Sequence, residues 1–485
     1  MTWPVTGPQG DHMDSAPQKM TAAQISGVAA MMLGTLVIAN DFTALNVALP
    51  AIEKAFQVDV TTAQWVITGY VLVFGVFIVT AGRLADMFGR RRIFFIGMTI
   101  FALFSLIGAM ATDVWMLLIS RAIMGIGGSM VWPAMLGITF SLVPEDKAAL
   151  AGGLILGFAG IGNAMGPMLG GVFTEYLSWR WIFYINVPVA IIAILVTLSV
   201  VPKDRVENIE KTVDYPGIMT LSLGLFALLL LLDIGADLGW LSPVVFGLLG
   251  LAVAAICLFF MVERRAGPKA LVPKEIMDNS AFKTSIAVIL TINVIYFASL
   301  FYLPQFMVKE LKFSAAQAGV GLLPILAMFA VTSFIAGPLF NRLGPKLMVT
   351  IGSGCLSLGI LILSFLDAST TYAGLVPGMM ILGIGLGFFF SSITTVGITA
   401  VDPSQSSLAG AILYMFQNAG GAIGLGLNTA IVVSAPTLLE GIRWAFAVDA
   451  ALGAVGVIIC VTLVDGPVTR ERIAAFFRKE KDGET

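Results

Sequence analysis

The sequence predicts an all-α integral membrane protein with 14 transmembrane helices, and composition is the first observation behind that prediction. Hydrophobic residues make up 58% of the 485 residues, charged residues make up 12%, and the mean hydropathy is +0.96. In soluble domains roughly a quarter of the residues are charged. Uncharged stretches of about 20 residues, enough for a helix to cross a bilayer, recur along nearly the whole chain. Because each span must satisfy its own backbone groups and the alternating polarity of barrel strands is missing, helices are expected.

The uncharged stretches form a pattern of six, two and six spans. The first six are expected at about 23–50, 61–81, 93–112, 114–136, 149–174 and 181–201. Two more, at about 215–236 and 243–262, lie between polar linkers, and the last six are at about 284–308, 314–338, 346–366, 372–396, 405–433 and 443–464. This pattern divides the chain into a tail (1–22), a six-helix bundle (23–201), linkers with two inserted helices (202–283), a second six-helix bundle (284–464) and a basic tail (465–485).

The basic residues predict the orientation of the chain in the membrane. Of the 27 Lys and Arg, 21 fall in segments that this helix count places on the side of the N-terminus, and five fall on the other side. The remaining one, Arg121, lies inside a span. Because cytoplasmic loops carry the excess of basic residues, both tails are expected in the cytoplasm and the protein is expected in the cell membrane as a multi-pass protein.

An internal repeat relates the two bundles. The segment GRLADMFGRR, which begins at Gly82, has a weaker echo in GPLFNRLGPK, which begins at Gly337. Similarly, Gly162 has a counterpart in Gly420. These offsets correspond to a shift of eight helices, and because eight is even, the bundles are expected to be parallel repeats with a helix pair inserted between them.

Three charged side chains are predicted well inside the spans: Asp41, Arg121 and Asp449. A charge at membrane depth costs at least ~2.5–3.5 kcal/mol, so it usually faces a partner or a water-filled pathway. Asp41 and Arg121 are predicted at similar depths, and two interpretations stay open for them. They either form a structural ion pair, or Asp41 exchanges a proton or meets a cationic substrate while Arg121 tunes its pKa. Asp449 is either a third proton-coupling residue or a residue at the membrane rim bonded to neighbouring helices.

The fifth span carries a glycine motif, GIGNAMGPMLGG. Gly162 and Gly166 form a GxxxG pair that lets two helices approach closely, and Pro167 removes a backbone donor. With Gly170 and Gly171 the motif extends to GxxxGPxxGG, which is much more specific than GxxxG alone.

The loop expected after the second span contains a second motif, with Gly82, Asp86, Gly89, Arg90 and Arg91. The simpler interpretation is that its arginines anchor the chain at the cytoplasmic surface. The alternative is a latch that holds a cytoplasmic gate closed through charge and helix-dipole contacts. The partial recurrence of the motif after the tenth span favours an architectural role.

Other chemistry is missing from the sequence. The sole histidine, His12, lies in the tail, so a histidine relay or a histidine metal site in the membrane is not expected, and no other metal site is predicted. The three cysteines fall within apolar spans at unrelated spacings, which argues against disulfides. There is no GxxxxGK phosphate loop and no hydrolase triad, so neither an enzyme nor ATP-driven transport by this chain is expected.

Together these motifs resemble those of the major facilitator superfamily, specifically its fourteen-helix drug:proton antiporters of the QacA and EmrB type. The stretch from Asp41 to Pro50 fits the D-x-T-x-x-N-x-A-L-P signature of that group, and the segment WRWIFYINVP resembles the entrance to its sixth helix. Arg121, with the glycines that follow it, fits the fourth-helix motif associated with proton coupling. The glycine motifs of the fifth span and of the loop after the second span also fit, although Met87 stands where that loop usually has a basic residue.

The resemblance implies alternating access, in which two bundles rock around a central cavity and proton entry drives substrate exit. The expected substrate is a hydrophobic or cationic drug, with the lipid bilayer as surroundings and the proton gradient as the energy source. No cofactor, no nucleic acid and no ATPase subunit is expected. The alternative is a transporter dedicated to one endogenous metabolite on the same fold. Candidates for the substrate cavity are Phe42, Asn46, Tyr70, Trp132, Phe158 and Tyr414, although aromatic residues in spans more often serve packing.

Overall fold

The computed structural model describes residues 20–144, 147–202, 213–239 and 242–464, and the regular structure in these ranges is helical. The first group of helices is α1 (Ala22–Phe56), α2 (Val60–Phe88), α3 (Arg90–Ala109), α4 (Val114–Leu142), α5 (Ala148–Tyr176), α6 (Trp181–Tyr184) and α7 (Asn186–Val200). Next come α8 (Tyr215–Leu238), α9 (Pro243–Ala266), η2 (Gly267–Lys269) and α10 (Lys274–Asp278). The last group is α11 (Ser280–Lys309), α12 (Ala315–Val320), α13 (Leu323–Leu343), α14 (Pro345–Leu363), α15 (Tyr372–Thr399), η3 (Pro403–Gln405), α16 (Ser406–Ser434) and α17 (Leu438–Leu463).

Fourteen spans in the described ranges are long and apolar enough to cross a membrane, which confirms the predicted fold class. Two of these spans are broken into two helices each, α6 with α7 and α12 with α13, where the sequence predicted unbroken helices. Pro188 explains the first break and Pro324 the second, because each lacks the N–H that would bond the carbonyl four residues earlier. The tails expected at the two ends of the chain lie almost entirely outside the described residues.

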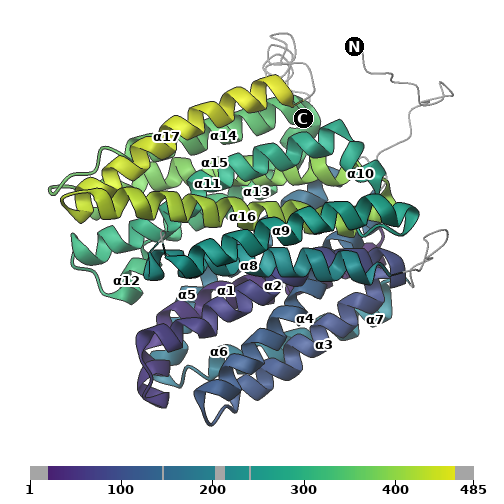
Figure 1. The fold of residues 1–485 in the computed structure, drawn as a ribbon, viewed down its shortest axis with the longest axis horizontal. Helices are drawn as coiled ribbons and strands as arrows, with labels where there is room; N and C mark the ends of the chain where they lie inside the picture. Colours follow the sequence, from purple (N-terminus) through teal and green to yellow (C-terminus); the bar gives the residue numbers. More distant parts are fainter. Residues whose placement is uncertain (1–19, 145–146, 203–212, 240–241, 465–485) are drawn as a thin grey trace.

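The same helix pairs recur in both halves of the chain, as the sequence repeat leads one to expect. In the first half α1 packs on α5 and α3 packs on α4; in the second half α11 packs on α16 and α14 packs on α15. Figure 1 shows the two groups one above the other, with the purple-to-blue helices below and the green-to-yellow helices above. Contacts between the groups run mainly through α2 with α16, α4 with α16, and α5 with α13 and α15.

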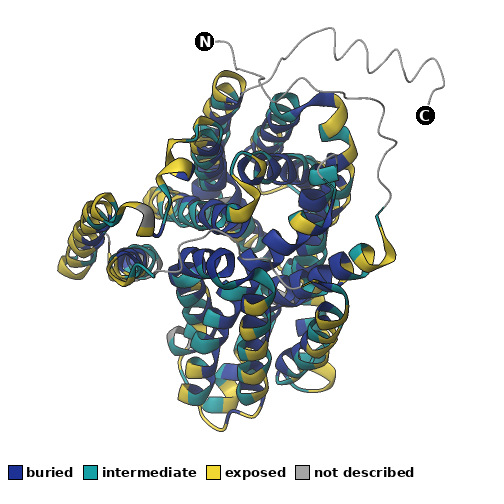
Figure 2. Cartoon of the chain, turned by 90° about the vertical axis from the view of Figure 1, so that its right-hand side faces the viewer, coloured by how far each residue is buried: buried dark blue, intermediate teal, exposed yellow. Residues whose placement is uncertain are grey.

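The inserted helices α8 and α9 lie outside both groups. α8 packs on α2 of the first group and on α16 of the second, whereas α9 packs mainly on α8. In Figure 2 this pair projects from the side of the molecule with exposed residues on its outer surface. Large apolar side chains such as Phe246, Val253 and Phe260 of α9 are about half exposed, which suits contact with lipid.

Several helices are longer than the sequence predicted. α1 continues through Pro50 to Phe56, because one proline removes a single hydrogen bond while the residues after it remain good helix formers. α2 continues to Phe88, well past the expected end of its span at residue 81. The second difference changes the interpretation of the motif at Gly82, which lies on a helix rather than in a loop.

Candidate functional site

The centre of the first bundle holds a buried ion pair between α1 and α4. Arg121 Nη1 lies 2.5 Å from Asp41 Oδ2, and the two side chains are 1% and 0% exposed. The guanidinium compensates a carboxylate charge that would otherwise be costly at this depth. The structure thus brings together two residues whose adjacency the sequence left open.

Polar groups from three more helices complete this ion pair. The Nε of Arg121 donates to the backbone carbonyl of Val66 on α2 at 2.8 Å. The amide of Asn186 on α7 donates to Asp41 Oδ1 at 3.3 Å and to the hydroxyl of Ser105 on α3 at 3.1 Å. Residues of five helices therefore belong to one hydrogen-bonded network around the Asp41 carboxylate.

An aromatic cluster lies beside the ion pair and consists of Phe42, Tyr70, Phe74, Trp132 and Tyr414. The Tyr70 ring centre is 4.2 Å from the guanidinium carbon of Arg121, and the Phe42 ring is 5.1 Å from that of Tyr70. Tyr414, on α16 of the second bundle, lies 4.8 Å from Trp132 and 5.6 Å from Phe74. The cluster therefore joins α1, α2 and α4 of the first bundle to α16 of the second through contacts between aromatic rings.

Two other cavity candidates lie apart from this cluster. Phe158 on α5 packs against Phe334 on α13 at 5.7 Å and makes no ring contact with the cluster in the described structure. Asn46 is exposed, and its amide donates to the carbonyl of Thr43 on its own helix at 3.2 Å. The structure therefore groups four of the six predicted candidates and leaves Phe158 in a separate contact between the bundles.

The glycine motif of α5 sets how closely α1 approaches. A Cβ on Gly162, Gly166 or Gly170 would lie within 3.0 Å of backbone atoms of α1, around Leu36 and Ala44. Gly171 faces Val47 at an ordinary contact distance, so it does not require the absence of a side chain. Pro167 lies inside the helix, and its Cβ approaches Gly319 on α12. The motif therefore positions the helix that carries Asp41.

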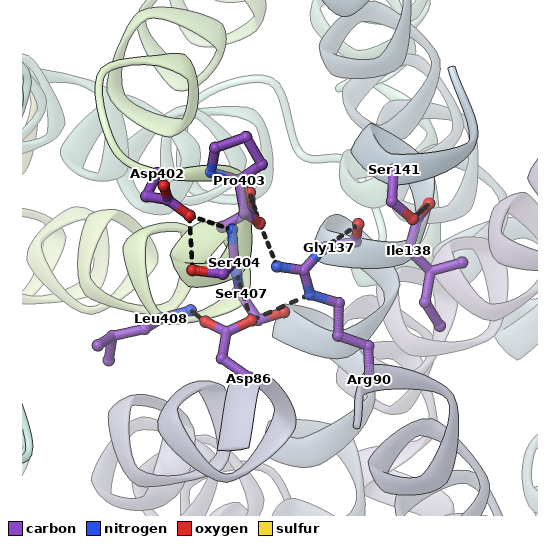
Figure 3. Close-up of polar contacts among 11 residues, drawn as sticks. Asp86, Arg90, Gly137, Ile138, Ser141, Asp402, Pro403, Ser404, Ser407 and Leu408 are labelled. Atoms are coloured by element: carbon purple, nitrogen blue, oxygen red, sulfur yellow. Dashed lines mark hydrogen bonds and ion pairs between the residues drawn. The ribbon is translucent and has the colours of Figure 1, made fainter. Parts of the chain in front are cut away.

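At one end of the bundles, Asp86 on α2 binds the first turn of α16 (Figure 3). Its carboxylate accepts hydrogen bonds from the backbone N–H groups of Ser407 at 3.3 Å and Leu408 at 2.8 Å. These N–H groups lack partners within their own helix, and the positive end of the helix dipole favours a carboxylate there. A side chain of the first bundle thus caps a helix of the second.

Arg90, the first residue of α3, strengthens this contact. Its Nε lies 3.0 Å from Asp86 Oδ1, and its guanidinium also donates to the carbonyl of Gly137 at 3.1 Å and to the carbonyl of Pro403. Pro403 belongs to the short helix η3 that precedes α16. Figure 3 shows its carbonyl beside the guanidinium of Arg90. We call Asp86, Arg90 and their partners on α16 and η3 the latch.

The other residues of the motif around Asp86 and Arg90 position the latch through contacts and backbone geometry in the first bundle. Gly82 lies on α2, and a Cβ there would come within 3.0 Å of the carbonyl oxygen of Ser407. Gly89 has a φ of 103° and alone separates α2 from α3. Arg91 donates to the carbonyls of Leu198 at 3.0 Å and Val201 at 2.6 Å, at the end of α7. The sequence expectation of a loop is wrong here, because this motif consists of the end of α2 and the start of α3, joined at a single glycine.

Asp449 is fully buried and lies near the middle of α17 in the second bundle, so it is not a residue at the end of its span. Its Oδ1 accepts a hydrogen bond from the amide of Asn428 on α16 at 3.1 Å. Its Oδ2 has no hydrogen-bond partner, and no described cation forms an ion pair with it. One of the two predicted alternatives combined a bond to a neighbouring helix with a position at the membrane rim. The structure contains the bond, to Asn428 of α16, but Asp449 lies within its span.

Comparison with known proteins agrees with this arrangement. A family model described as Major Facilitator Superfamily matches residues 31–425, with a second match at 330–481. The chain belongs to the Major Facilitator Superfamily. The family predicted from the motifs is therefore confirmed, and the latch and the buried ion pair are parts of a superfamily transporter.

Superfamily members with similar sequences carry names that refer to drug resistance. The puromycin resistance protein pur8 of Streptomyces alboniger is 32% identical over 84% of this chain and 82% of its own length. The multidrug resistance protein Stp of Mycobacterium tuberculosis is 30% identical over 86% of this chain and 77% of its own length. The tetracenomycin C resistance and export protein of Streptomyces glaucescens is 27% identical over 84% of this chain and 75% of its own length.

A solved structure shares the fold of this superfamily chain. The crystal structure of the human organic anion transporter MFSD10 (TETRAN) superposes with a TM-score of 0.69 and covers 91% of this chain and 100% of its own. The sequences are 15% identical. At that identity the likeness concerns the arrangement of the helices.

Sequence reasoning missed several residues that complete the site of this superfamily member. Asn186 and Asn428 donate to the buried carboxylates, Ser105 accepts a hydrogen bond from Asn186, and Phe74 links the aromatic residues of the two bundles. A lone amide in an apolar span was a usable signal for the two asparagines. The carbonyl partners carry no signal in the sequence. No group of three or more His, Cys, Asp or Glu in the described ranges could hold a metal ion.

Proposed function

We propose that this protein exports hydrophobic or cationic drugs or antibiotics across the cytoplasmic membrane in exchange for protons. The resistance and export functions named for its relatives support the choice of substrate class. The proton gradient is the energy source, so neither a cofactor nor an ATPase subunit takes part. The observation that carries the proposal is the buried pair of Asp41 and Arg121 beside the aromatic cluster.

Protonation of Asp41 is the proposed coupling event. A proton on Asp41 removes the charge that holds the Arg121 guanidinium, so a charge-assisted contact becomes a weaker hydrogen bond. Arg121 also binds the Val66 carbonyl and stacks on Tyr70, both on α2. Neutralising Asp41 therefore changes how α2 is held against α1 and α4.

The helix α2 connects this event with the latch. Val66 near one end and Asp86 near the other are 20 residues apart on one continuous helix, or about 30 Å at 1.5 Å per residue. A tilt of α2 at the ion pair moves Asp86 relative to the first turn of α16. Proton binding and gate opening are thus coupled through a rigid element.

The charge bias supports the assignment of the latch to the cytoplasmic side. Arg83, Arg90, Arg91 and Arg92 cluster at that end, and basic residues accumulate on the cytoplasmic side of membrane proteins. In this conformation the transporter is closed toward the cytoplasm. Protons then reach Asp41 from outside, where an energised cell is more acidic, and enter as the latch opens.

A transport assay with Asp41→Asn tests the proposal. In inside-out vesicles with an imposed pH gradient, we expect wild type to move ethidium and the variant to lose nearly all gradient-driven transport while remaining folded. Asp278→Asn, at an exposed residue whose side chain is 67% accessible, is the matched control and is expected to behave as wild type. Undiminished gradient-driven transport by Asp41→Asn would contradict the proposed coupling.

The range of substrates distinguishes a drug exporter from a transporter of one metabolite. Cells that express the wild type are expected to show raised resistance to several unrelated dyes and antibiotics. Resistance lost in parallel for all compounds in Asp41→Asn supports one shared coupling step. A wild type that moves a single compound contradicts the broad assignment.

A further inference from the structure

Asp449 differs from Asp41 in having no counter-ion. The helices packed on α17 are α11, α14 and α16. Their ionisable residues are Lys283, Tyr296, Tyr302 and Lys309 on α11, Lys346 and Cys355 on α14, and Tyr414 on α16. None of them forms an ion pair or hydrogen bond with Asp449 in the described structure, nor do Glu440, Arg443 or Cys460 of its own helix.

The one polar partner of Asp449 cannot neutralise a carboxylate. The amide of Asn428 has two N–H groups, and it donates to Asp449 Oδ1 at 3.1 Å and to the carbonyl of Gly424 at 2.9 Å. Its donors are thus both in use. Asp449 Oδ2 remains without a donor, fully buried in the bundle. An ionised carboxylate without a cation is unfavourable in such a place, whereas the protonated acid carries no charge and needs no cation.

The position of Asp449 in the repeat supports a role in coupling. Asn186 and Asp449 each stand 14 residues before the last residue of the sixth helix of their bundle, α7 or α17. In the first bundle the amide stands at this position and binds a carboxylate, and in the second the carboxylate stands there and binds an amide. The site in the second bundle is therefore a rearranged form of the first without the arginine.

The helix α16 connects Asp449 with the latch. Leu408 receives Asp86 at the start of α16, and Asn428 binds Asp449 20 residues later, about 30 Å along the same helix. Movement of α16 away from α2 thus also changes the packing around Asp449. We propose that Asp449 is a second proton-binding site, which holds a proton while the latch is closed and releases it when α16 moves as the latch opens. The proton site stands on its own, whereas the release step rests on the proposed proton antiport.

Infrared spectroscopy tests whether Asp449 holds a proton, independently of any transport. We expect the purified wild type at neutral pH to show a carbonyl band of a protonated carboxylic acid that Asp449→Asn lacks and the control Asp278→Asn retains. Asn428→Leu leaves the acid in place and removes its hydrogen bond, so it is expected to shift the same band. A band that is missing from wild type, that persists in Asp449→Asn, or that is unmoved in Asn428→Leu would overturn the proposal.

Counting protons tests whether this proton takes part in the transport cycle. In proteoliposomes we expect Asp449→Asn to transport ethidium with about one proton fewer per ethidium than wild type. An equal number of protons in the two proteins would overturn the release step. A wild type that moves no ethidium would instead contradict the proposed function, and the infrared result would still decide whether Asp449 is a proton site.

Discussion

The two bundles share their helix packing but differ in the polar groups at their centres. In the first, Gly162, Gly166 and Gly170 bring α5 against α1; in the second, Gly420 and Gly424 bring α16 against α11 in the same way. The first bundle surrounds its acid with a cation and an amide, whereas the second gives its acid an amide alone. The two copies of the repeat thus share the close helix packing that the fold requires, but they differ in the charged partner of the buried acid.

Removing the cation from the first bundle should have the largest effect. Arg121→Ala leaves Asp41 buried without its counter-ion, and breaking a buried pair in this way typically costs about 3–5 kcal/mol. Lowering the pH should reduce the loss, because a protonated Asp41 no longer needs a cation. Unfolding of the purified protein in detergent measures the effect at neutral and acidic pH.

The exposed Arg443 on α17 supplies the matched control for that experiment. Arg443→Ala removes the same side chain from an exposed position and is expected to change stability by less than about 0.5 kcal/mol. If Arg121→Ala and Arg443→Ala unfold with equal free energies, the ion pair contributes nothing particular to the stability of the first bundle.

Substituting the glycines should affect both bundles alike. Gly166→Ala pushes a methyl group against Ala44, and Gly424→Ala pushes one against Val294, so each variant is expected to lose about 1–3 kcal/mol. Gly247→Ala on α9, where no atom lies within 4 Å, should gain up to about 1 kcal/mol from helix propensity. Thermal unfolding of the three variants provides the comparison. A large loss of stability in only one of Gly166→Ala and Gly424→Ala would show that the glycine packing is tighter in one bundle than in the other.

The smallest effect is expected from Asp449→Asn. If Asp449 is already neutral, the amide has the same shape and charge, and stability should change by less than about 1 kcal/mol. Asp41→Asn, in contrast, leaves Arg121 without a counter-ion and should lower the unfolding temperature clearly. Matched melting curves of the two variants sharpen the comparison, and equal losses would contradict it.

The transmembrane spans, the family, and Asp41 and Arg121 as candidates for an ion pair could be predicted from the sequence, because each prediction depends on local chemistry. An apolar run of fixed length defines a span, and a lone charge such as Asp41 or Arg121 stands out within it. The sequence could not place these two side chains together, because adjacency of helices depends on packing across the whole bundle. It also placed Asp86 in a loop, since charged residues at the end of α2 resemble the start of a linker.

The latch illustrates a second limit of sequence reasoning. Asp86 binds backbone N–H groups and Arg90 binds backbone carbonyls, so the partners could be almost any residue type. Nothing in the side chains of Leu408 or Gly137 indicates such a contact. The helix N-terminus that binds Asp86 exists as a binding site only when α16 is folded and lies beside α2, so it cannot be predicted from side-chain types.

The position of α8 gives the membrane-facing sides of the protein unequal properties. The two bundles meet along α2 with α16 and along α5 with α13, and α8 covers the first of these junctions. None of the described helices outside the bundles covers the second. A third helix therefore lies over the α2–α16 junction, whereas the α5–α13 junction is formed by the helices of the two bundles alone and presents their own side chains at the outer surface.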